Sequence, residues 1–233
     1  TQVIVNIAAP TARQHGEMAA ALEGLEGIAG LEVNISSPNM KDGGMLFGCS
    51  AQASRSVIEQ VRRATDLPVI AKLTPIVTDV FAIAQAAGAG GADALSLVIT
   101  YVGMAVEWRQ RRPRLGGITG GLSGPAIKPL ALRLVWLVAQ NCDVPVIGIG
   151  GIMNTDDVLE FIVAGASAVQ IGTVQFVRPR VAVDMLDGIK AALEETGAGS
   201  IADLVGTLET SGDAITVRQA GSEKEVEDAA GTS

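Results

Sequence analysis

Residues 144–151, Val-Pro-Val-Ile-Gly-Ile-Gly-Gly, and residues 168–173, Ala-Val-Gln-Ile-Gly-Thr, decide the fold of this chain. Each stretch is a short apolar run without polar alternation, which is typical of a strand buried on both faces of a parallel sheet. Each run ends in a glycine turn, at Gly150-Gly151 and at Gly172-Thr173, that could present backbone N–H groups to a phosphate. A single turn of this kind is often only a tight turn, but two after consecutive strands favour phosphate binding.

Four more apolar runs precede these two, and helical stretches lie between them. The predicted strands are 3–8, 30–35, 68–73, 94–99, 144–149 and 168–172. The predicted helices are 17–28, 51–64, 78–89, 127–141 and 155–164. Thr78-Asp79 and Asn154-Thr155 are helix-start residues that support this pattern.

The alternation of strand and helix fits an α/β protein, either a (β/α)8 TIM barrel or a doubly wound sheet. We favour the barrel, because no GxGxxG turn follows the first strand and the glycine turns follow the last two. A barrel needs eight strands, so we expect an incomplete one with about six of eight βα units, the first two missing. The chain also starts directly on a strand without Met, which suggests that it was cut from something longer.

The amino-acid composition excludes several classes of function. Of 233 residues 48% are hydrophobic and 18% charged, which excludes a disordered chain, and the net charge of −8 argues against nucleic acid as a partner. The two cysteines, Cys49 and Cys142, cannot supply a four-thiolate metal or iron–sulfur site. No signal peptide or membrane-spanning run is visible, so we expect no membrane partner and a cytoplasmic location. We expect a barrel over 1–206 and an acidic, disordered tail over 207–233.

Two long loops, 36–50 and 100–126, follow predicted strands, where active sites usually lie. Asn34, Ser37 and Asn39 gather at the first of them, and carboxamides suit a planar ligand with amide edges. An Asx-type turn closed by Pro38 explains the same residues equally well. The polar segment 119–129 closes the second loop before a helix and could face an anion, or could be a hinge.

Single residues carry further predictions. Lys72 ends an apolar strand, where a charge is unfavourable unless it meets an anion or polar ligand, and this favours a functional role over a side chain that reaches solvent. His15 is the only histidine, so histidine-based triads and metal sites are excluded, and we expect it on the surface. The cluster Arg109, Arg111, Arg112 and Arg114 indicates a solvated loop or a partner contact.

Several motifs together resemble the dihydroorotate dehydrogenases, most closely the NAD-linked class 1 catalytic subunit. They are Asn34-Ile-Ser-Ser-Pro-Asn39, Lys41-Asp-Gly-Gly44, Phe47-Gly48, Lys72-Leu-Thr-Pro75 with Val77-Thr-Asp79, Gly148-Ile-Gly-Gly151 and the highly specific Thr119-Gly-Gly-Leu-Ser-Gly-Pro-Ala-Ile-Lys-Pro129. The resemblance runs from residue 1 to about residue 206. It implies an FMN-containing (β/α)8 barrel that oxidises dihydroorotate to orotate in de novo pyrimidine (UMP) biosynthesis.

The resemblance also implies roles for single residues. Ser37 matches the catalytic base that removes a proton from substrate C5 while hydride leaves C6 for flavin N5. Lys72 matches a lysine beside the flavin pyrimidine edge, whose charge would stabilise the reduced flavin. The other implied flavin contacts are Asn6, Asn34, Val98, Gly124, Gly150, Gly151, Gly172 and Thr173. The implied substrate contacts are Asn34, Asn39 and Thr100.

Three features depart from the family pattern. Position 37 is Ser, as in the membrane-associated class, whereas the NAD-linked type carries Cys. Ile76 and Ile99 stand where the family has Asn, and the Asn matching Ile99 would bind substrate. The first two family strands, with a lysine and an Asn-rich loop, have no counterpart. The alternatives are therefore a paralogous dihydropyrimidine oxidoreductase, a catalytically incompetent fragment, and, more remotely, a flavin-free phosphosugar enzyme.

The family also implies partners for this chain. It implies a homodimer of the full-length catalytic subunit and a separate electron-transfer subunit with FAD and an iron–sulfur centre, which passes electrons to NAD. The two cysteines require that any iron–sulfur centre lie on that other chain. We predict no metal-binding residues in this chain.

Overall fold

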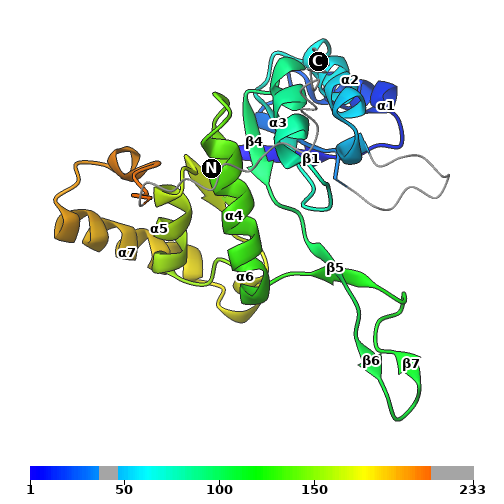
Figure 1. Ribbon diagram of the computed structural model, residues 1–233. Helices are drawn as coiled ribbons and strands as arrows, with labels where there is room; N and C mark the ends of the chain where they lie inside the picture. Colours follow the sequence, from blue (N-terminus) through cyan, green and yellow to red (C-terminus); the bar gives the residue numbers. More distant parts are fainter. Residues whose placement is uncertain (37–46, 211–233) are drawn as a thin grey trace, which may run out of the picture.

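The computed structural model describes residues 1–36 and 47–210, so Ser37, Asn39 and residues from 211 onward lie outside the described part. Six strands form one parallel sheet (Figure 1): β1 (Val3–Ile7), β2 (Ile28–Asn34), β3 (Val69–Lys72), β4 (Ala94–Leu97), β9 (Val146–Ile149) and β10 (Ala168–Gln170). All six predicted strands are confirmed. They pair in chain order, β1-β2-β3-β4-β9-β10, without the reversal that defines a doubly wound sheet. The order is that of a barrel wall.

Helices follow the strands in the same order. They are α1 (Ala12–Leu22), α2 (Ala51–Arg62), α3 (Val80–Ala89), α4 (Lys128–Ala139), α5 (Thr155–Val163), the short α6 (Val174–Val177) and α7 (Val181–Thr196). Consecutive helices pack against one another from α1 to α5, and α5 packs against α7. Side chains alternate along each strand, so Leu31, Val33, Ala71 and Leu95 enter the core while their neighbours face the other side of the sheet. Of the described helices, none combines the length and apolarity needed to cross a bilayer.

The helix boundaries follow from capping side chains. Asp79 accepts from the Ala82 N–H, and Asn154 forms a capping box with Asp157, as their positions in the sequence predict. The predicted first helix, 17–28, is wrong by about five residues at each end, because Thr11 caps the helix by accepting from the Gln14 N–H. Helix α7 was not predicted. The described residues also include three short 3₁₀ turns: η1 (Phe47–Cys49), η2 (Pro125–Ile127) and η3 (Ile201–Leu204).

The predicted loop 100–126 is an antiparallel arm that extends away from the sheet (Figure 1). Strand β5 (Tyr101–Gly103) pairs with β8 (Gly120–Leu122), and beyond them β6 (Val106–Glu107) pairs with β7 (Arg112–Pro113). The arginine cluster lies on this arm, where Arg114 pairs with Glu107 at 3.1 Å and Arg109 stacks over Trp108. Its residues are exposed, which agrees with the predicted solvated position.

His15 is not on the surface as predicted; it lies fully buried in α1. Its Nδ1 lies 3.0 Å from the Thr11 carbonyl oxygen, and its Nε2 accepts from the Ala9 N–H at 3.2 Å. The carbonyl and the amide together fix the neutral ring with its proton on Nδ1. Phe47 meets the ring edge-on, with centroids 5.9 Å apart. Burial disfavours the charged ring and therefore lowers the pKa of His15 below its ordinary value. Hydrogen bonds with the backbone of Thr11 and Asn34 raise the pKa, but by less.

His15 should make the free energy of unfolding depend on pH. Its folded-state pKa is depressed, so the unfolded chain binds the proton first. The stabilisation is therefore complete above about pH 6.5 and is lost as the pH falls toward the folded-state pKa, by at most about 1.4 kcal/mol per pH unit. Urea titrations between pH 7.5 and 5.5 measure this slope. His15→Gln should flatten it, and an equal slope in both proteins would contradict the prediction.

Candidate functional site

A cavity of about 190 Å³ lies at the carboxyl ends of β3, β4, β9 and β10. Eight residues that the sequence predicted as site residues line it: Lys72, Val98, Thr100, Gly124, Gly150, Gly151, Gly172 and Thr173. They come from five separate segments of the chain, and the parallel sheet brings these together because all its strands end at the same edge. Ser123, which accepts from the Thr173 hydroxyl at 2.7 Å, and Gln170 also line it.

Glycines form one wall of the cavity, and three of them have conformations that only glycine adopts readily. Gly124 has φ +87°, Gly150 has φ +132° and Gly151 has φ +76°. A Cβ at Gly151 would lie 2.7 Å from the Lys128 backbone nitrogen and 2.9 Å from the Gly124 carbonyl oxygen. A Cβ at Gly172 would meet no atom within 4 Å. The first turn therefore packs tightly against the start of α4, whereas the second leaves open space for a ligand.

The two glycine turns give a matched pair of substitutions. Gly151→Ala should lower the free energy of unfolding by about 1–3 kcal/mol, because it combines a left-handed backbone with a clash against main-chain atoms. Gly172→Ala should change it by less than about 0.5 kcal/mol, since its methyl group enters open space. Urea denaturation of both variants measures the difference. Equal losses would contradict this account of the wall.

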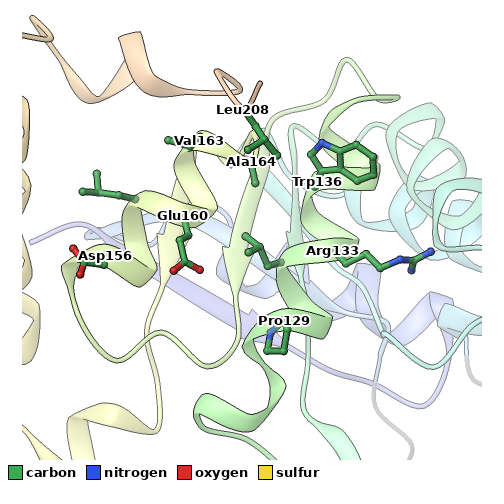
Figure 2. Close-up of a pocket in the computed structure, with 10 residues that line it drawn as sticks. Pro129, Arg133, Trp136, Asp156, Glu160, Val163, Ala164 and Leu208 are labelled. Carbon is green, nitrogen blue, oxygen red and sulfur yellow. The ribbon is translucent and has the colours of Figure 1, made fainter. Parts of the chain in front are cut away.

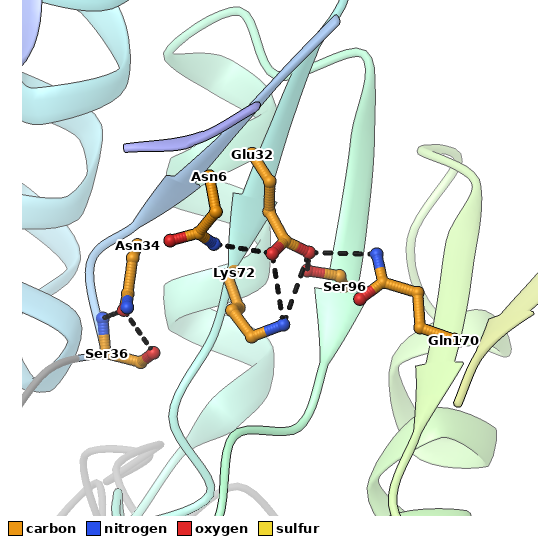
Figure 3. Close-up of polar contacts among 7 residues, drawn as sticks. All are labelled: Asn6, Glu32, Asn34, Ser36, Lys72, Ser96 and Gln170. Carbon is orange, nitrogen blue, oxygen red and sulfur yellow. Dashed lines mark hydrogen bonds and ion pairs between the residues drawn. The ribbon is translucent and has the colours of Figure 1, made fainter. Parts of the chain in front are cut away.

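A buried carboxylate lies beside the cavity, on the face of the sheet opposite the helices (Figure 3). Glu32 of β2 accepts from Asn6 Nδ2 at 2.6 Å, from Ser96 Oγ at 2.8 Å and from Gln170 Nε2 at 2.9 Å. The Lys72 ammonium lies 3.1 and 3.3 Å from its two oxygens. The side chains of Glu32 and Lys72 are 8% and 14% exposed. Five strands thus each supply one member of a hydrogen-bonded polar cluster, which we call the Glu32 cluster.

The contacts of Glu32 keep it ionised. Burial alone would raise its pKa, but the Lys72 charge and the hydrogen bonds from Gln170, Ser96 and Asn6 together hold the pKa below its ordinary value. The three other donors are uncharged amides and a hydroxyl. The Glu32 cluster therefore contains one negative and one positive charge, and its carboxylate stays charged at neutral pH.

The Glu32 cluster requires a curved sheet. Strands β2 and β10 are four positions apart in the sheet, which in a flat sheet would separate them by about 19 Å. Gln170 of β10 nevertheless donates to Glu32 of β2 at 2.9 Å. The sheet must curl so that the side chains of its concave face meet, as they do inside a barrel.

The remaining predicted residues have other surroundings. Asn6 points at Glu32, and Asn34 Oδ1 accepts from the Ser36 N–H at 3.1 Å and from its hydroxyl at 2.7 Å. This is the Asx turn that was the alternative interpretation of Asn34. Ser37 and Asn39 lie outside the described residues.

Sequence reasoning did not single out Glu32, Ser96 or Gln170. Only Glu32 gave a signal, because a carboxylate inside the apolar run Leu31-Glu32-Val33 needs a partner when both faces of the strand are buried. The partner is Lys72, which explains how that lysine is accommodated in its strand.

A larger hollow of about 680 Å³ lies between α4 and α5, away from this site (Figure 2). It is mainly apolar, with Leu132, Trp136, Leu159 and Leu208 in its lining, and Arg133 and Glu160 at its rim. None of the predicted site residues lines it. Size alone therefore does not mark the functional site in this protein.

The fold and the site define a class, an α/β protein with a curled parallel sheet and a glycine-lined cavity at the carboxyl ends of its strands. The chain belongs to the dihydroorotate dehydrogenase family, whose model matches residues 1–193. It is 51% identical to a protein of Pelobacter propionicus over 90% of this chain and 69% of the relative. It is 52% identical to one of Geotalea uraniireducens over the same shares and 46% identical to one of Bacteroides thetaiotaomicron. All three are named as the catalytic subunit of dihydroorotate dehydrogenase B (NAD(+)).

Proposed function

We propose that this chain binds FMN and oxidises dihydroorotate to orotate, as an oxidoreductase acting on a CH–CH donor in pyrimidine biosynthesis. One observation carries the proposal: eight residues that a family resemblance marks as ligand contacts line a single cavity. Family membership and relatives named for this reaction support it.

The cavity suits the two ends of FMN. The glycines 150, 151 and 172 with Thr173 offer main-chain donors for a phosphate. Lys72 and Gln170 offer a cation and a carboxamide, which suit the polar edge of a flavin ring. Val98, Ile99 and Ile149 supply apolar surface to the same cavity. The donor set thus fits the chemistry of the cofactor.

Each residue then has a specific task. Ser37 removes the proton from C5 of the substrate, and Asn34, Asn39 and Thr100 hold the pyrimidine ring. When bound, FMN supplies the acceptor for the hydride that leaves C6. The Lys72 ammonium, which lines the cavity, would offset the negative charge that accompanies this transfer.

A related dihydropyrimidine is the second candidate substrate. Ile99 lines the cavity and has no polar group for the pyrimidine amide. A site that leaves such a group unpaired loses about 1–3 kcal/mol of binding free energy. A substrate without the matching polar group would not suffer this loss.

The proposal extends to the assembly. The relatives are named as catalytic subunits, which supports a partner subunit, and we assign FAD and an iron–sulfur centre to it. The finer predictions that the sheet is six of the eight strands of a TIM barrel, that catalytic subunits pair as a homodimer, and that the protein is cytoplasmic are part of the same proposal.

Flavin spectroscopy tests the proposal. The purified chain, mixed with FMN and dialysed, should retain about one flavin per chain, and anaerobic dihydroorotate should bleach its absorbance. Bleaching by another dihydropyrimidine but not by dihydroorotate would favour the second candidate. A chain that retains no FMN would contradict the proposal and support the fragment hypothesis.

A further inference from the structure

The cavity and the Glu32 cluster share Lys72 and Gln170, and this sharing suggests a role for Glu32. We propose that Glu32 is a positioning residue that fixes the Lys72 ammonium and offsets its charge, and thereby sets the reduction potential of the flavin bound in the cavity. The inference rests on the proposed binding of FMN. It assigns a function to Glu32, which is not among the described residues that line the cavity.

The contacts between Glu32 and Lys72 support the first part of the proposal, that Glu32 fixes the position of the ammonium. A lysine side chain has several rotatable bonds, so an ammonium without a partner would occupy many positions. Both oxygens of Glu32 lie within 3.3 Å of the Lys72 nitrogen, and Asn6, Ser96 and Gln170 hold those oxygens from three other strands. The carboxylate cannot turn without losing several hydrogen bonds. The ammonium is therefore held at one place, against the two carboxylate oxygens of Glu32 (Figure 3).

The charges of Glu32 and Lys72 support the second part of the proposal, that Glu32 influences the reduction potential of the flavin. Lys72 brings a positive charge to the cavity, but the negative charge of Glu32 lies against it. A ligand in the cavity therefore experiences a pair of opposite charges rather than a full cation. Removing the Glu32 charge would expose the ligand to the full charge of Lys72. A flavin gains negative charge on reduction, so this change should favour the reduced form.

The isosteric variant Glu32→Gln tests the charge effect. Sulfite adds to flavin N5 and leaves negative charge on the ring, so its Kd reports the same electrostatics as the potential. We expect the sulfite Kd of FMN-loaded Glu32→Gln to fall about tenfold, the order given by one unit charge near a cavity of effective dielectric constant about 20. The two-electron potential should rise by about 30 mV for that tenfold change.

Matched variants separate this role from a structural one. Asp157→Asn removes a carboxylate from the other largely buried lysine pair, Lys128–Asp157 at 2.6 Å, and should leave the sulfite Kd within about twofold. Glu32→Asp keeps the charge but shortens the reach, so it should give a smaller shift, and it replaces Glu32→Gln if that variant does not fold.

The outcomes distinguish the two proposals. FMN bound by Glu32→Gln with unchanged sulfite Kd and potential would overturn the role of Glu32 and leave the proposed function intact. Failure of the unsubstituted chain to bind FMN would refute the proposed function and this inference with it.

Discussion

Replacing Ser37 with alanine is expected to lower kcat for dihydroorotate oxidation by about 10²–10⁴-fold, the usual contribution of a positioned general base. The family resemblance assigns Ser37 the proton at C5, and an alanine side chain accepts none. Affinity for FMN should stay within about twofold, because Ser37 is not among the proposed flavin contacts. Anaerobic stopped-flow bleaching of the flavin measures the rate, and a flavin titration measures the affinity.

Ser37→Cys is the matched control for this prediction. A thiol titrates near pH 8.5, far below a serine hydroxyl, so the cysteine variant should retain activity and show a rate that rises toward that pH. Ser37→Cys differs from the unsubstituted protein in a single heavy atom, sulfur in place of oxygen. An alanine variant as fast as the unsubstituted protein would show that another group removes the proton.

Replacing Lys72 with methionine is expected to lower the free energy of unfolding by about 3–5 kcal/mol, the usual effect of leaving a buried charge without its partner. Glu32 is 8% exposed and its other hydrogen-bond partners are uncharged. Methionine matches the length of the lysine chain, so the variant removes the charge and leaves little empty space. Urea denaturation at pH 7 measures the loss.

A double-mutant cycle controls for other effects of the substitution. Glu32→Gln together with Lys72→Met should be more stable than the Lys72→Met variant alone, because no unpaired charge remains. The coupling between the two sites should be at least about 1 kcal/mol. Additive losses would show that the ion pair contributes nothing specific, and would remove the physical basis for a fixed ammonium at this place.

Much of the fold was readable because its signals are local. The six strands of the parallel sheet are mainly apolar runs, and the helices after Asp79 and Asn154 begin at their own capping side chains. The errors also have local causes. The first helix was placed five residues too late because Thr11 was not recognised as its cap, and the arm of 101–122 was assigned to a loop because its strands are two or three residues long.

His15 shows where local reasoning fails. The sequence places it in a polar segment, and a lone histidine there is usually exposed. His15 is nevertheless fully buried, and Phe47, more than thirty residues further along the chain, packs edge-on against its ring. A contact between segments so distant in sequence leaves no pattern around His15 itself.

The sequence by itself determined the strands, most of the helices, the family and eight residues of the cavity, because each depends on short apolar runs, capping residues or a motif whose members lie close together in the chain. Only the tertiary structure decided that Glu32, Ser96 and Gln170 join Lys72. Glu32 and Gln170 are 138 residues apart in sequence and four strands apart in the sheet. They meet because twisted parallel strands curl the sheet, and this curvature belongs to the whole sheet and to none of its strands alone.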